Sequence, residues 1–163
     1  MKRYTQAEFD AFERDEKGIK YCPTGDYSQI KSFGERCSFG VLCNFGECCS
    51  FGDRCCFGEC CSFEEWCSFE ECCDFGECCS FGECCSFGKW CSFGERCSFG
   101  ERCNFGGGGA VLENSAVLGI GAILENSAAS GNKAALGSIA ISVSGAILRE
   151  SALPNRVILS PRG

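Results

Sequence analysis

The stretch CSFGERCSFGERCNF, residues 91–105, holds two and a half copies of a six-residue unit built on phenylalanine and cysteine. Outward from it, phenylalanine recurs at every sixth position from Phe33 to Phe105, and cysteine recurs with the same period from Cys37 to Cys103. A short period sustained over so many copies predicts a repeat architecture, in which each unit buries its apolar side against its neighbours.

The segment Cys-Ser-Phe predicts a short strand with an inward and an outward side. Because side chains alternate along a strand, cysteine and phenylalanine share one side and serine takes the other. Cysteine and phenylalanine prefer burial, so the chain should form an all-β parallel solenoid around them. We expect the following glycine to supply the backbone freedom of a corner. The predicted core includes Phe57, Phe75 and Phe93 on one face, with Cys61, Cys79 and Cys97 beside them.

After residue 105 the composition changes, but the period of six continues through Val111, Val117 and Ile123. An unbroken register would place these residues in the phenylalanine column and Leu112 at an exposed corner. The outward position between the inward columns then holds alanine throughout. An apolar face of that extent is typical of an interface. The predicted oligomer interface is Ala110, Ala116, Ala122, Ala128, Ala134, Ala140, Ala146 and Ala152.

Three segments follow from these patterns: a cap and lead-in at 1–32, a Phe/Cys-rich solenoid at 33–103, and an Ala/Val/Leu-rich continuation with the C-terminal end at 104–163. An open solenoid needs a cap, because its end exposes strand edges and core.

Within the predicted cap, Thr5 and Glu8 have the spacing of a capping box, which predicts a short helix over residues 6–13. Aromatic residues of this segment, among them Phe9, should then cover the first coil. Tyr21 and Tyr27 are in phase with Phe33, so the solenoid is expected to begin near residue 21.

The chain has 19 cysteines, of which those in the inward column should act as small hydrophobic residues. Neighbouring strand residues face opposite sides, so a doublet cannot easily close around one zinc ion, and we predict no metal site. Cys60 and Cys78 are one coil apart and form the best intrachain pair for a disulfide. Cys48 and Cys84 are two coils apart and are expected to crosslink subunits instead.

The column pattern resembles the hexapeptide motif of left-handed β-helix proteins, most clearly in the segment 111–116. The resemblance implies a left-handed triangular β-helix of about seven coils and a homotrimer. The family includes acyl- and nucleotidyl-transferases. Its acyltransferases use a catalytic histidine and loops that interrupt the coils. This chain has no histidine, and its repeat has no insertion. We therefore expect no enzyme activity, no catalytic residue and no cofactor.

A net charge of -7 argues against a nucleic-acid partner, because phosphate binding needs a basic surface. No apolar run is long enough for a membrane helix, and the N-terminus lacks the apolar stretch of a signal peptide. Tandem Ser-Phe-Gly-x-x-Cys tracts also resemble those of bacteriophage structural proteins. That resemblance implies a virion spike, fibre or capsid-decoration protein that contacts other structural proteins; otherwise the expected location is the cytoplasm.

A binding module is the alternative to a purely structural role. Stacked acidic corners at Glu47, Glu65, Glu83 and Glu101 offer oxygen ligands to divalent cations, although a solvated face, partly neutralised by neighbouring arginines, is the preferred interpretation. The tryptophans Trp66 and Trp90 fall at corners, where an exposed ring can contact a partner or a glycan.

Overall fold

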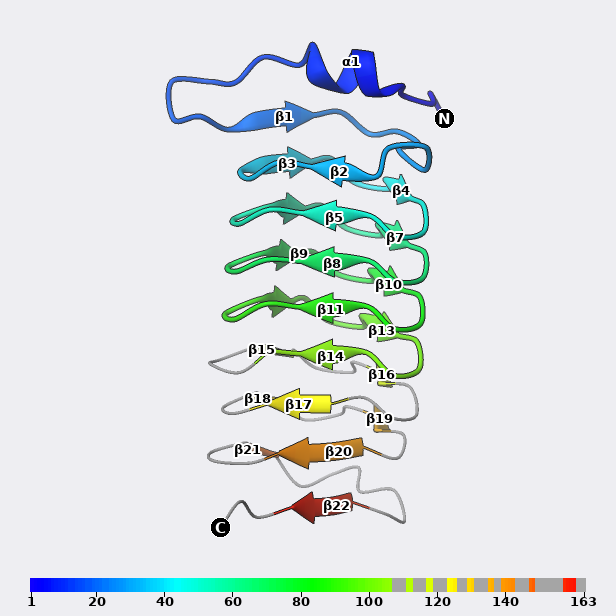
Figure 1. Ribbon diagram of the computed structural model, residues 1–163, viewed down its shortest axis with the longest axis vertical. Helices are drawn as coiled ribbons and strands as arrows, with labels where there is room; N and C mark the ends of the chain where they lie inside the picture. The colour runs from blue at the N-terminus through cyan, green and yellow to red at the C-terminus, as the bar shows by residue number, and fades with distance from the viewer. Residues whose placement is uncertain are drawn as a thin grey trace.

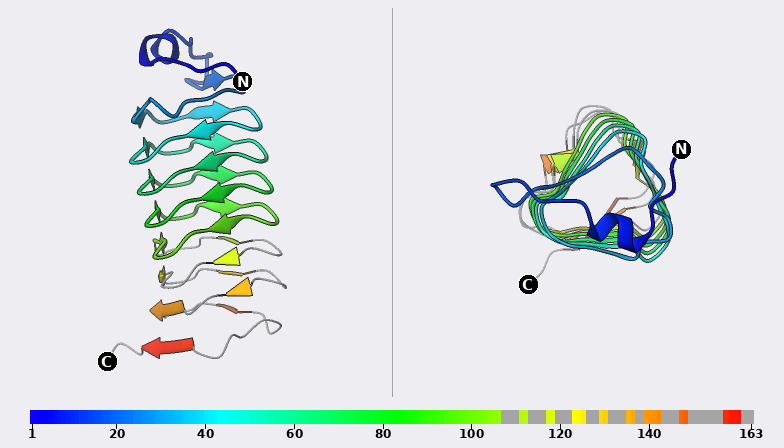
Figure 2. Two further views of the ribbon diagram at one scale, coloured as in Figure 1. Left: turned by 90° about the vertical axis from the view of Figure 1, so that its right-hand side faces the viewer. Right: turned by 90° about the horizontal axis from the view of Figure 1, so that it is seen from above.

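The chain forms a three-sided rod of stacked coils with a short helix across its N-terminal end (Figures 1 and 2). The computed structural model describes residues 1–106 throughout, and beyond them the strands at 111–112, 117–118, 123–125, 129–130, 135–136, 139–142, 147–148 and 157–160. The expected all-β parallel solenoid is confirmed.

Each side of the rod is one parallel sheet. The first contains β1 (Lys20–Cys22), β3 (Cys37–Phe39), β6 (Cys56–Phe57), β9 (Asp74–Phe75), β12 (Ser92–Phe93), β15 (Val111–Leu112), β18 (Ala129–Ser130) and β21 (Ile147–Leu148). The second contains β4 (Asn44–Phe45), β7 (Ser62–Phe63), β10 (Ser80–Phe81), β13 (Ser98–Phe99), β16 (Val117–Leu118) and β19 (Ala135–Leu136). The third contains β2 (Ser32–Phe33), β5 (Ser50–Phe51), β8 (Ser68–Phe69), β11 (Ser86–Phe87), β14 (Asn104–Phe105), β17 (Ile123–Glu125), β20 (Ile139–Ser142) and β22 (Val157–Ser160).

The winding is right-handed. In Figure 1, β5, β8 and β11 face the viewer and run to the left, whereas β6, β9 and β12 lie behind them and run to the right, while the chain descends. Seen from its N-terminal end, as in the right-hand view of Figure 2, the chain turns clockwise as it recedes. The left-handed winding implied by the family resemblance is therefore wrong. Right-handed connections are the usual solution for parallel strands, because strand twist favours them.

The core consists of the predicted phenylalanine and cysteine columns, and each of these residues from Phe33 to Phe105 is buried. The ring of Phe75 stacks on Phe57 and Phe93 in the adjacent coils, with centroids 4.9 and 4.8 Å apart and nearly parallel planes. Neighbouring columns meet edge to face, as between Phe75 and Phe81 at 5.0 Å and 87°. Both arrangements suit the quadrupole of an aromatic ring. Cys61, Cys79 and Cys97 are also buried, as expected.

The corners differ from the prediction, because their glycines do not adopt a left-handed conformation. The left-handed residue is instead the one before each inward cysteine, with φ between 53 and 61°. This set comprises Arg36, Leu42, Cys48, Arg54, Cys60, Trp66, Cys72, Cys78, Cys84, Trp90, Arg96 and Arg102. The glycines serve close approach between coils: a Cβ on Gly52 would lie 2.7 Å from the backbone nitrogen of Glu35.

The left-handed corner residues also carry hydrogen bonds between coils. The amide of Cys60 donates to the carbonyl of Glu77 at 2.8 Å, and the amide of Arg54 donates to that of Glu71 at 2.9 Å. The same bond recurs at the corners along the rod, so the corner backbone is paired as the strands are. These bonds keep non-glycine residues in a conformation that costs each of them about 1–2 kcal/mol.

Replacing Leu42 with asparagine should stabilise the rod. Leu42 has φ 57° and an exposed side chain. Asparagine tolerates the left-handed region better than leucine. We expect Leu42→Asn to increase the free energy of unfolding by about 0.5–1 kcal/mol, measured by guanidinium denaturation. The matched change Leu42→Val should decrease it, because a β-branched side chain is least tolerated there. Equal effects of the two changes would contradict the assigned strain.

The N-terminal end is closed by α1 (Gln6–Asp10), which is shorter than the predicted helix but starts at the predicted capping box. Phe9 packs edge to face on Phe33, with centroids 5.1 Å apart. Tyr27 stacks on Phe45 and continues its column, as its phase predicted. Tyr21 does not, because it pairs with Ser38 and is 60% exposed, and Cys22 takes the position beside Phe39.

One buried cation fastens the cap to the first strand. The ammonium of Lys20 donates to the carbonyl of Phe9 at 2.8 Å and to that of Asp10 at 3.3 Å, and it lies 4.4 Å from the ring centroid of Phe9. It thereby adds a side-chain donor to carbonyl groups at the C-terminal end of the short helix, where the Phe9 carbonyl also accepts from the amide of Phe12 at 3.2 Å.

We expect Lys20→Met to loosen this cap. Methionine keeps much of the length of lysine but cannot donate to the helix carbonyls, so about 1.5–3 kcal/mol of local stability should be lost. The measurement is amide hydrogen exchange in residues 7–12, which should become faster. Lys17→Met, at an exposed position, is the matched control. Unchanged protection in Lys20→Met would show that the ammonium does not hold the helix.

The unbroken register expected after residue 105 is wrong. Phe93 pairs with Leu112 instead of Val111, and Phe99 pairs with Leu118 instead of Val117. Leu124, instead of Ile123, then pairs with Ile141. A slip of one residue exchanges the two faces of a strand. The predicted outward direction of the alanine column rested on the unbroken register. Ala140 lies in β20 and pairs with Ile123, the partner of Asn104, so it has the register position that was predicted for it. The other seven interface alanines lie outside the described residues.

Candidate interaction surfaces

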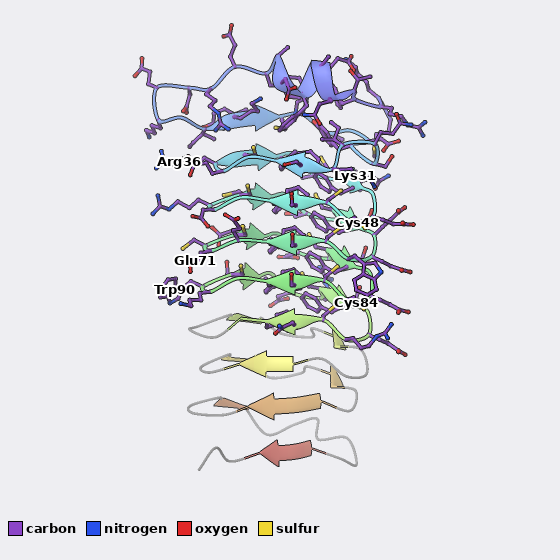
Figure 3. All side chains as sticks on the ribbon, viewed as in Figure 1. Lys31, Arg36, Cys48, Glu71, Cys84 and Trp90 are labelled. Carbon is purple, nitrogen blue, oxygen red and sulfur yellow. The ribbon has the colours of Figure 1, made fainter. Side chains whose placement is uncertain are left out.

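The outward face of the rod is organised by three corner columns, each made of left-handed residues from successive coils. Figure 3 shows Arg36 and Trp90 at one edge and Cys48 and Cys84 at another. The first column contains Arg36, Arg54, Cys72 and Trp90; the second contains Leu42, Cys60, Cys78 and Arg96; the third contains Cys48, Trp66, Cys84 and Arg102. The left-handed conformation recurs at each of these positions.

The second corner column brings the predicted pair Cys60 and Cys78 together. Cys60 is exposed, Cys78 is half-buried, and both are free thiols. Partial desolvation, followed by the neighbouring Cys78 thiol, raises the pKa of Cys60. In the third column Trp66 lies between Cys48 and Cys84, which fits the expectation that these two do not join within one chain. The outward Cys56 lies in β6 instead, where it pairs with Asp74.

The inward cysteines have a second role that the sequence did not reveal. From Cys55 to Cys103, each thiol approaches the carbonyl oxygen of the residue that follows a phenylalanine in the preceding coil. The distances from Sγ to oxygen are 3.4 Å for Cys61 to Gly40 and 3.3 Å for Cys97 to Gly76. A buried carbonyl without a donor is costly, and a thiol is a weak donor that fits a narrow space. The cysteine column therefore both fills the core and serves the corner carbonyls.

Burial and mutual contact also shift the acidity of these thiols. A hydrogen bond to Cys61, with burial second, raises the pKa of Cys43. The pKa of Cys61 and of Cys79 is raised to about 12. A thiol that accepts from a neighbour is shifted the other way, so the contact with Cys49 lowers the pKa of Cys67.

Two of the glutamates predicted to bind cations make other contacts, Glu83 through its carboxylate and Glu47 through its backbone. The Glu83 carboxylate pairs with Arg102 at 3.0 Å, and Lys31 donates to the backbone carbonyl of Glu47. In the described part of the chain, no three potential ligands among cysteine, aspartate and glutamate come together to hold a metal ion. Trp66 and Trp90 are 59% and 56% exposed at corners, as predicted, but they belong to different columns.

Among the described residues, the helix is too short to cross a bilayer. No family model, curated protein or solved structure is significantly similar to this chain.

Proposed function

We propose that this protein is a non-enzymatic structural rod within a larger assembly, such as a virion spike, fibre or capsid-decoration component. The observation that carries the proposal is the continuous column of stacked rings from Phe33 to Phe105. Close-packed interiors resist compression and transmit strain, which are the properties of a spacer. Hydrogen bonds between coils at both strands and corners support the same conclusion.

A transferase role has less support. The chain has no histidine, so it lacks the general base of the acyltransferases that its repeat resembles. From Phe33 to Phe105 the coils succeed one another without an inserted loop. The rod should therefore show no acetyl-CoA-dependent transfer. Measurable turnover that one corner substitution abolishes would overturn the structural proposal.

Native mass measurement of the purified protein, with and without reductant, tests the assembly. We propose a homotrimer, as the resemblance of the repeat implies, so we expect three times the chain mass in reductant. A larger mass without reductant would identify crosslinks through the outward cysteines. A monomer under both conditions would contradict the homotrimer. The remaining proposal would then be that the rod docks onto another structural protein.

The alanine interface has its own test. Ala140 is the interface alanine whose register position the structure describes, and Ala140→Glu should place a charge in the proposed interface, where desolvation opposes association. Ser68→Glu introduces the same charge at an exposed position of β8 and should leave the mass unchanged. If Ala140→Glu keeps the parental mass, residue 140 is not in an interface.

A further inference from the structure

A pocket of about 300 Å³ lies beside the N-terminal end of the rod, between the turn at residues 15–19 and the first corner column. Its lining contains three cations, Lys17, Arg36 and Arg54, and no carboxylate. Ile19 and Tyr21 contribute apolar surface. This concentration of positive charge is unexpected on a chain whose net charge is -7.

The wall formed by the turn is firmly held. The Asp15 carboxylate accepts from the amides of Lys17 and Ile19, both at 2.9 Å. The guanidinium of Arg14 donates to the carbonyls of Gly18 and Glu35 at 2.6 and 3.0 Å. Arg36 donates to the carbonyl of Lys17 at 3.2 Å, which joins the turn to the corner column. The pocket is therefore formed before any ligand arrives.

The arginines at the other end of the described coils are paired differently. Arg96 binds Glu77 at 2.9 Å and Arg102 binds Glu83 at 3.0 Å, and each partner lies in the preceding coil. At the corresponding position before Arg36 the chain has Lys17, a cation. Within the described residues, neither Arg36 nor Arg54 forms an ion pair. Two guanidinium groups on successive coils and an added ammonium repel one another unless an anion lies between them.

We propose that this pocket binds a small organic anion, with its carboxylate or phosphate group among Lys17, Arg36 and Arg54 and its apolar body against Ile19 and Tyr21. Arginine suits such a ligand because its planar fork donates to two oxygens at once. The pocket lies beside the turn next to the cap, and its binding does not depend on the proposed role of the rod.

Titration calorimetry with 1-naphthyl phosphate tests this site. Inorganic phosphate, which lacks the apolar body, and 1-naphthol, which lacks the charge, should each bind at least tenfold more weakly. Arg54→Gln should weaken binding of naphthyl phosphate about tenfold, as expected for the loss of a charge-assisted hydrogen bond. Arg102→Gln removes the same charge from a paired corner and should leave binding unchanged. Replacing the phosphate by 1-naphthoate distinguishes a phosphate site from a carboxylate site.

Arg54 makes no described side-chain hydrogen bond, so Arg54→Gln should fold as the parent does, and circular dichroism checks this. Arg36→Gln provides a second variant with the same expected loss of binding. Absence of saturable binding by the parent, or equal weakening in Arg54→Gln and Arg102→Gln, would overturn the proposal. Neither outcome bears on oligomeric mass, so the structural role is judged separately.

Discussion

Raising the pH from 8 to 10 in the presence of reductant is expected to unfold the solenoid. The pKa of seven inward thiols is raised in the folded protein, namely Cys43, Cys49, Cys55, Cys61, Cys73, Cys79 and Cys85. An unfolded cysteine ionises with a pKa of about 8.5. Above that pH the unfolded chain therefore loses protons that the folded chain retains, and the free energy of unfolding falls with pH.

The size of this effect comes from the number of thiols. Between pH 8 and pH 10, each such thiol should lower the free energy of unfolding by about 2 kcal/mol, and seven by roughly 13 kcal/mol. That sum is comparable to the whole stability of a typical domain, about 5–15 kcal/mol. Thiols with a lowered pKa, such as Cys67, act in the opposite direction around pH 8.5 and offset part of this loss.

The measurement is guanidinium denaturation followed by circular dichroism at intervals between pH 7 and pH 10. Replacing one inward thiol, as in Cys79→Ala, should make the pH dependence shallower, even though it lowers stability at neutral pH. Replacing the outward Cys72 by serine should leave the dependence unchanged. A denaturation midpoint that is constant from pH 8 to pH 10 would show that the buried thiols do not resist ionisation.

Phe75→Ala should lower the free energy of unfolding by about 3–5 kcal/mol, because the missing ring leaves a cavity that the stacked coils cannot close. Phe75 is only 4% exposed and is held between Phe57 and Phe93 in its own column. It also meets Phe69 edge to face at 4.9 Å. Each aromatic contact adds about 0.5–1.5 kcal/mol beyond the burial of area.

Phe75→Leu is the matched control, because leucine refills much of the volume and removes only the ring contacts. Its loss should be clearly smaller than that of Phe75→Ala when both are measured by guanidinium denaturation at pH 7. If the two substitutions have equal effects, ring stacking dominates the column and cavity formation does not. If Phe75→Ala is no worse than an outward change such as Ser80→Ala, the assigned core is wrong.

The period of six was enough to predict the strands, their inward residues and the parallel stacking. Phenylalanine and cysteine alternate with serine over many copies, and only one side of such a strand can be buried. The capping box at Thr5 and Glu8 was equally readable, because it depends on two residues three positions apart. The corner positions of Cys60, Cys78 and the two tryptophans followed from the same spacing.

What the sequence did not reveal depends on backbone geometry. A six-residue period is compatible with either handedness, so the sequence did not predict the handedness of the coils. The left-handed residue at each corner is arginine, leucine, cysteine or tryptophan, types that give no hint of a positive φ. The slip beside Phe93 follows a run of four glycines, which made an alternative register possible but did not select it. The cationic pocket joins residues 17 and 54, which only the first coils bring together.

Three six-residue units complete one turn of this rod, so the number of units sets an angle as well as a length. Deleting a single unit would leave rings stacked on rings, yet everything beyond the deletion would rotate by about a third of a turn relative to the cap. Deleting three units would shorten the rod by about 4.8 Å and restore the original orientation. Phe57 pairs with Phe75, so one coil contains 18 residues. A partner that contacts both ends of the rod therefore finds them in the same relative orientation only when the length changes in steps of 18 residues.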